Sequence, residues 1–101
     1  MYIYNVTIKI DIDIEQEWLT WMQEEHLKEV VATGMFDSYS FLELIEPTEE
    51  GSKTFIAQYF TDSIVRYEAY IEAFAPMLRQ KGMDKFGDRF IAFRTIIKKH
   101  I

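Results

Sequence analysis

The chain has 101 residues, the length of one domain, and we expect a single domain over residues 1–101. It contains no cysteine, so disulfides and thiolate chemistry are excluded. Its formal net charge of −6 repels nucleic acid and anionic lipid surfaces, and no apolar run approaches the roughly 18 residues of a membrane span. Met1 leads into a strand-like run without a signal-peptide pattern, so we expect a cytoplasmic protein with neither nucleic acid nor membrane as a partner.

The first predicted strand covers residues 2–12. Its even-numbered residues are all apolar or aromatic and most of the odd-numbered ones are polar, which is typical of a strand with one buried face. A helix is predicted next, with Asp13 as its N-cap and Gln16 completing a capping box. It should end at Thr33 and Gly34, because glycine readily adopts the left-handed conformation that closes a helix.

Two further strands are predicted at residues 36–45 and 54–60. The loop between them contains Pro47 and Gly51, which punctuate a hairpin connection. Because the link is short, we expect the two strands to be antiparallel neighbours.

A second helix is predicted to begin with Asp62 or Ser63 as its cap. Its apolar residues recur at helical spacing and form one stripe that should face the sheet. The stripe consists of Ile64, Tyr67, Ile71, Phe74 and Leu78.

Pro76 should break or kink this helix, because proline removes a backbone donor and clashes with the preceding turn. Gly82 and Gly87 indicate an irregular segment after it, and the last strand is predicted at residues 89–97. The order is therefore β-α-β-β-α-β. We predict an α+β protein of the ferredoxin-like class with a four-stranded antiparallel sheet.

Large apolar residues occupy both faces of the predicted strands. We take the even-numbered residues of the first strand to lie under the helices, and the other face then stays open; for the second strand the opposite register remains possible. The open face would carry the apolar residues Tyr39, Phe41, Ile56, Phe60 and Phe90. Its polar residues would be Asn5, Thr7, Glu43, Gln58 and Arg94. So large an apolar face indicates a covering partner, and we predict a homodimer, a dimeric α+β barrel with a cavity between its two sheets.

Several short motifs stand out along the chain: the run at residues 2–7, the spacing Trp18-x-x-Trp21-Met22-x-x-x-His26, the run at residues 33–36, Lys85-Phe86, and Phe93-Arg94-Thr95. Together they resemble a family of small bacterial proteins classed as a domain of unknown function. The family is similar in fold to the dimeric α+β barrel group, which includes antibiotic-biosynthesis monooxygenases, haem-degrading enzymes, stress-responsive barrel proteins and muconolactone isomerases. The resemblance implies the fold and a dimer. It carries no active-site assignment, because no catalytic motif of that group matches this sequence residue by residue.

His26 is the most distinctive titratable residue of the first predicted helix. On a helical wheel it lies within the apolar arc, so its ring should point toward the sheet. A pairing with Glu29, three residues later, would place an imidazole beside a carboxylate, an arrangement suited to a general base. The structural alternative is a histidine that only satisfies a backbone carbonyl or a tyrosine hydroxyl. His26 and Glu29 are the candidate catalytic residues.

Trp18 and Trp21 belong to the same predicted helix. Indole faces bind cations and flat rings, so a ligand-stacking role is conceivable for both. Trp18 falls inside the buried arc of the helix and Trp21 on its border. We therefore expect core packing or a dimer contact to account for them.

Arg94 is the costliest polar residue on the predicted open face, because a buried guanidinium needs a partner to offset its desolvation. The structural interpretation pairs it with Glu43 in an ion pair across the sheet or the dimer interface. The functional interpretation makes Arg94 the anchor of an anionic ligand. The candidate ligand-binding residues are Asn5, Thr7, Phe41, Glu43, Gln58, Phe60, Phe90 and Arg94.

No metal site or cofactor is predicted. The two histidines are far apart in the sequence, there is no cysteine, and no glycine-rich phosphate loop follows a strand. Three functions remain. The first is a homodimer that binds a small organic molecule between its sheets. The others are a cofactor-free enzyme of the monooxygenase or isomerase type, suggested by the fold resemblance and His26, and a protein-interaction module.

Overall fold

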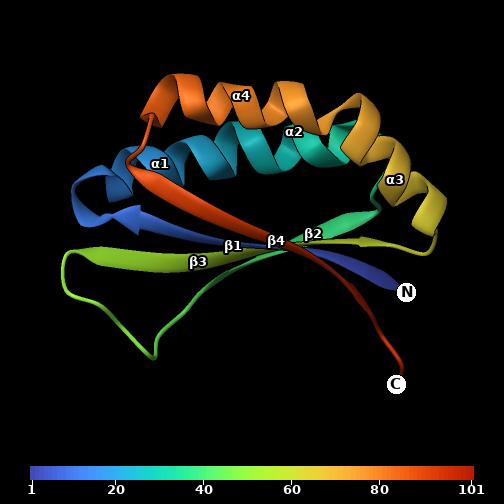
Figure 1. The fold of residues 1–101 in the computed structure, drawn as a ribbon, viewed down its shortest axis with the longest axis horizontal. Helices are drawn as coiled ribbons and strands as arrows, with labels where there is room; N and C mark the ends of the chain where they lie inside the picture. The colour runs from blue at the N-terminus through green and yellow to red at the C-terminus, as the bar shows by residue number, and fades with distance from the viewer.

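The computed structural model describes all 101 residues (Figure 1). The strands are β1 (Tyr2–Asp11), β2 (Ser38–Glu43), β3 (Ser52–Thr61) and β4 (Phe90–Lys98). The helices are α1 (Glu15–Trp21), α2 (Leu27–Ala32), α3 (Ile64–Ala73) and α4 (Ala75–Phe86). A 3-10 turn, η1 (Ile12–Ile14), precedes α1, and a π-helical turn, η2 (Met22–His26), joins α1 to α2.

The four strands form one antiparallel sheet in the order β2-β3-β1-β4. β1 is paired along nearly its whole length with both β3 and β4, whereas β2 and β4 are the edges. This is the β-α-β-β-α-β arrangement of the ferredoxin-like class. The predicted α+β fold class is confirmed.

All four helices lie on one side of the sheet, and Figure 1 shows the opposite side uncovered. The core lies between the two layers. The even-numbered residues of β1 from Tyr4 to Ile10 are buried there, as predicted, together with Phe55, Ala57 and Tyr59 of β3. Alternation along β1 identifies the covered face, because each of its even-numbered residues from Tyr2 to Ile10 is apolar or aromatic.

The strand faces predicted for β2 and β4 are wrong. Phe41 is paired opposite Ala57, and Arg94 opposite Val6, so both residues share the helix-covered face with their buried partners. Glu43 and Phe90 lie on this face as well. Hydrophobicity does not distinguish the two faces of either strand, and moving a strand by one residue exchanges them. The covered face of β2 carries Phe41, whose ring stacks on the ring of the buried Phe55 with the two ring centroids 5.6 Å apart.

The segment from η1 to α2 replaces the first predicted helix. It ends as expected, with Ala32 as the last residue of α2 and a positive φ of 81° at Gly34. Its beginning differs, because the α1 N-cap position makes no side-chain hydrogen bond. Asp13 lies inside η1 and pairs with Arg89 instead of capping the helix. The predicted capping box is therefore wrong.

The second helical segment begins as predicted, since the Ser63 hydroxyl accepts a hydrogen bond from the Arg66 amide at 3.2 Å. The chain breaks between α3 and α4 near Pro76, also as predicted. The segment after Pro76 is not irregular, however. Proline in a first turn lacks only an amide that would be unpaired anyway, so α4 starts there and continues to Phe86. None of the helices has both the length and the apolar character that a membrane crossing requires.

Candidate functional site

Four of the candidate ligand-binding residues lie on the uncovered face of the sheet. They are Asn5, Thr7, Gln58 and Phe60. Asn5 occupies the centre of a small hydrogen-bond network: its amide oxygen accepts from Gln58 Nε2 at 3.1 Å, and its Nδ2 donates to Thr7 Oγ1 at 3.4 Å. These three polar groups hydrogen-bond to one another in the middle of the uncovered face.

The other four candidates, Phe41, Glu43, Phe90 and Arg94, lie on the covered face, so the sheet divides the predicted ligand site in two. Glu43 is on the edge strand β2 and Arg94 on the opposite edge strand β4, with β3 and β1 between them. The ion pair expected between these two residues across the sheet does not form within the chain. Their suggested roles in ligand binding stay predictions.

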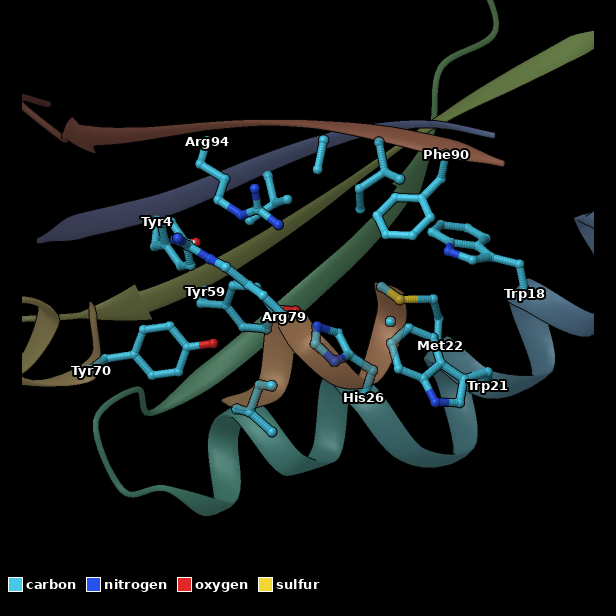
Figure 2. Close-up of a pocket in the computed structure, with 15 residues that line it drawn as sticks. Tyr4, Trp18, Trp21, Met22, His26, Tyr59, Tyr70, Arg79, Phe90 and Arg94 are labelled. Carbon is cyan, nitrogen blue, oxygen red and sulfur yellow. Dashed lines mark hydrogen bonds between the residues drawn. The ribbon is translucent and has the colours of Figure 1, made fainter. Parts of the chain in front are cut away.

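A cavity of about 50 Å³ lies between the helices and the covered face of the sheet. Side chains from β1, α1, η2, β3, α3, α4 and β4 line it, so residues from both ends of the chain meet there. Figure 2 shows a polar end, where Arg79 and Arg94 converge near Tyr4, and an aromatic end with Trp18, Trp21 and Phe90. His26 lies between the two ends (Figure 2).

Arg79, on α4, and Arg94, on β4, supply the positive charge of the cavity. Arg79 Nη2 donates to the Tyr4 hydroxyl at 3.0 Å, whereas its Nε is buried without a hydrogen-bond partner. Neither guanidinium has a carboxylate within 4.0 Å. The other two arginines of the chain, Arg66 and Arg89, both pair with aspartates at the surface.

His26 is the last residue of the π-helical turn, and its ring lines the cavity. The ring stacks on Trp21 with centroids 4.7 Å apart and 22° between the planes. Its Nδ1 is buried without a hydrogen-bond partner. Glu29 does not supply that bond, because its carboxylate accepts a hydrogen bond from Lys81 at 2.5 Å. The arrangement differs from the hydrogen-bonded pair expected for His26 and Glu29.

Burial keeps His26 neutral. Loss of hydration lowers the pKa of its imidazole from 6.5 to about 4; the Glu29 carboxylate opposes this shift, and the positive charges of Arg94 and Lys81 add to it. Burial likewise raises the pKa of Tyr59 and of Tyr70, whose side chains line the same cavity. The cavity therefore combines two cations with a neutral imidazole and neutral phenols.

Arg79 is a charged cavity residue that the sequence analysis does not identify. An irregular segment was expected after Pro76, and a residue in such a segment has no assigned face. As a helix, residues 75–86 place Ala75, Leu78, Gly82 and Phe86 on one buried stripe, with Arg79 at its border. That spacing is the signal that identifies Arg79, together with the tolerance of proline in a first helical turn.

A resident metal has no obvious ligand set. No group of three or more histidine, cysteine, aspartate or glutamate side chains lies close enough together to hold an ion. The polar end of the cavity consists of guanidinium, phenol and imidazole groups. The guanidinium groups repel cations. The donor set suits an anion better than a metal ion.

The fold is shared with several solved structures. An ethyl tert-butyl ether d (ethd) family protein from Bacillus halodurans c-125 superposes with a TM-score of 0.69 at 10% identity, over 99% of this chain and 100% of that one. A dimeric ferredoxin-like protein from an uncultured marine organism gives 0.64 at 14% identity, over 100% of this chain and 99% of that one. A second dimeric ferredoxin-like protein from an uncultured marine organism gives 0.55 at 14% identity, over 99% and 98%.

These likenesses show the fold, and they assign no site. Among curated proteins, no sequence matches the chain. The family model described as Domain of unknown function (DUF4286) matches residues 1–100. The resemblance found in the sequence motifs is thereby confirmed, and the chain belongs to the DUF4286 family.

Proposed function

We propose that the protein is a homodimer that binds a small organic molecule in the cavity between the helices and the sheet of each protomer. One observation carries the proposal: His26 Nδ1 and Arg79 Nε are buried at this cavity and have no hydrogen-bond partner. Buried polar atoms in native proteins are nearly always paired, so two unpaired donors or acceptors at one cavity point to a guest. A mainly apolar cavity with a few convergent polar groups is the usual form of a small-molecule site.

This location replaces the space between two sheets, where the ligand was first expected. Arg94 and Phe90 are on the covered face, whereas Asn5, Thr7 and Gln58 on the uncovered face are hydrogen-bonded to one another. The buried polar atoms without a partner, on His26 and Arg79, both lie at the cavity under the covered face. We therefore assign the ligand to the covered face.

The uncovered face is proposed as the dimer interface. Its β4 residues include Ile91 and Phe93, which are 56% and 63% exposed, and Leu42 of β2 extends the apolar area. A patch of large apolar side chains across a sheet is a typical interface for a second copy. Two solved structures with the same fold are described as dimeric ferredoxin-like proteins, which supports a dimer.

A cofactor-free enzyme is the second candidate. The observation that favours it is the neutral imidazole of His26 with a free Nδ1 inside the cavity. A neutral imidazole next to cations can accept a proton from a bound substrate whose developing negative charge those cations stabilise. A ligand seen in contact with His26 is the first requirement for this function.

Native mass spectrometry of the purified protein tests both parts of the proposal in one experiment. We expect a dimer, and after incubation with a panel of small acids, amides and amines we expect at least one compound to add up to two copies per dimer. Gly82→Leu, which fills the cavity, should abolish that added mass, whereas Val65→Leu on the outer surface of α3 should retain it. A monomer contradicts the dimer, and a panel in which no compound binds contradicts the ligand site.

A further inference from the structure

We infer that the cavity is a binding site for a short-chain monocarboxylate, held by Arg79 and Arg94, with His26 beside the carboxylate and the carbon chain toward the aromatic end. The inference rests on the proposed small-molecule site and names the class of its ligand. It is carried by charge, by the size of the cavity and by the arrangement of its two ends.

Charge is the first support. The chain has a formal net charge of −6 and 17 acidic residues, yet the two guanidiniums at the cavity have no carboxylate partner. Arg66 and Arg89, by contrast, both have one. The buried Nε of Arg79 has lost its water and has no partner, and Arg94, an exposed residue at the edge of the cavity, adds a second positive charge to it. A carboxylate in the cavity would give the buried Nε a partner and would be attracted by both charges through charge-assisted hydrogen bonds.

Size is the second support. At roughly 10–15 Å³ for each water-sized group, a cavity of about 50 Å³ accepts about three to five such groups. A carboxylate group itself counts as three, so a carboxylate with up to two further carbon atoms has that size. Large cofactors and nucleotides do not fit a space of about 50 Å³.

The third support is the separation of the two ends. Arg79, Arg94 and the tyrosine hydroxyls lie at one end, and the rings of Trp21 and Phe90 lie at the other (Figure 2). A ligand with one charged end and one apolar end matches this division. Inorganic phosphate carries more charge but has no apolar part, so it leaves the aromatic end unfilled.

His26 supplies a further contact and a readout. Its Nδ1 has no partner, so a carboxylate that arrives beside it gains a hydrogen bond from the ring when Nδ1 carries the proton. The added negative charge also favours the imidazolium, so binding should take up a proton and become tighter as the pH falls. The charged and titratable groups around the ring are Glu29 on α2, Arg79 and Lys81 on α4, Arg94 on β4, Tyr4 on β1, Tyr59 on β3 and Tyr70 on α3.

Calorimetric titration of the whole protein with propionate, propionamide and inorganic phosphate tests the inference. Propionamide has nearly the same shape as propionate but no charge. We expect propionate to bind at least about tenfold more tightly than propionamide or phosphate at pH 7, because hydrogen bonds to two guanidiniums are lost with the charge. Equal binding of acid and amide overturns the carboxylate site but leaves the small-molecule site standing. Absence of binding by all three, and by the wider panel of acids, amides and amines, overturns both.

Variants separate the two arginines from general positive charge. Arg79→Gln and Arg94→Gln should each weaken propionate binding at least about tenfold, whereas Lys28→Gln, which removes an exposed and unpaired cation on α2, should leave it unchanged. Wild-type affinity in both arginine variants overturns the inference. The acid and amide comparison on the wild-type chain needs no variant and decides the question if either arginine variant fails to fold. For His26, an affinity for propionate that does not rise between pH 7 and pH 6, where the ligand stays ionised, overturns its contact with the carboxylate.

Discussion

The imidazole of His26 stacks on the indole of Trp21 although the two residues are five positions apart in one helical segment. In a regular α-helix they would lie about 140° apart at roughly 100° per residue. The π-helical turn Met22–His26, with its i to i+5 spacing, brings both rings to the same side. The turn thus positions the imidazole at the cavity, and Trp21 shields one of its faces.

The buried imidazole makes stability depend on pH. Between pH 6.5 and about 4 the unfolded chain holds a proton on His26 that the folded chain does not, so acid favours unfolding over this range. We expect His26 to account for a loss of about 2 kcal/mol between pH 7 and pH 5. Urea unfolding of the wild-type protein and of His26→Gln at both pH values measures this loss. The variant should lose less stability on acidification. An identical loss in the two proteins would contradict the buried neutral ring.

Gly82 of α4 faces the ring of Trp21. A β-carbon built at this position would lie 3.4 Å from Trp21 Cη2 and 3.6 Å from Phe90 Cζ, which is ordinary contact. Gly82→Ala should therefore fold and gain up to about 1 kcal/mol from helix propensity. Gly82→Leu has no such room and should lose about 1 to 3 kcal/mol. Thermal or urea unfolding of both variants checks the pair, and a leucine variant as stable as the alanine one would show that the space is larger than described.

The hydrogen bond between Arg79 and Tyr4 holds the guanidinium at the cavity. Tyr4→Phe removes the acceptor of a charge-assisted bond from a buried position, and we expect a loss of about 1 to 3 kcal/mol in the free energy of unfolding. Tyr67→Phe is the matched control, because the Tyr67 ring packs on Tyr4 but its hydroxyl makes no hydrogen bond in the chain. Equal effects of the two substitutions on urea unfolding would mean that the bond contributes little.

Phe93 is the most exposed large side chain on the uncovered face of the sheet. If that face is the dimer interface, Phe93→Asp places a carboxylate in its apolar area and should produce a monomer. Val65→Asp, at an equally exposed apolar position on α3, should leave the dimer intact. Light scattering coupled to size exclusion gives the mass of each variant. A dimeric Phe93→Asp protein would exclude this face as the interface.

The sequence predicted the fold well where one face of an element is clearly apolar. The strict alternation of β1 identified the covered face, and Ser63 marked the start of α3. It failed for β2 and β4, since Phe41 and Leu42 on one strand, and Phe90 and Ile91 on the other, give neighbouring positions similar hydrophobicity. In those strands the face is set by pairing with β3 and β1, which is a long-range property that the local pattern does not contain.

The sequence predicts only part of the candidate site, because the local pattern places some of its residues on the wrong face or on none. His26 was singled out by its place on the apolar arc, and it does reach the cavity, although the partner expected for it, Glu29, binds Lys81 instead. Arg94 was assigned to the wrong face together with its strand. Arg79 is not identified from the sequence, because regular structure is expected to end at Pro76, whereas Pro76 lies in the first turn of α4.

The π-helical turn also has a consequence for chain length. Such a turn holds one residue more than an α-helical turn, so it amounts to a single inserted residue that the helix absorbs by bulging. Removing an exposed residue of the turn, such as Gln23, would leave Trp21 and the imidazole four positions apart, and in a regular α-helix that spacing keeps them on one face. A family member one residue shorter in this helix should therefore present the same side chains to the cavity. In an alignment of this chain with such a shorter member, the one-residue gap would belong between Trp21 and His26, and the histidines should be matched across it.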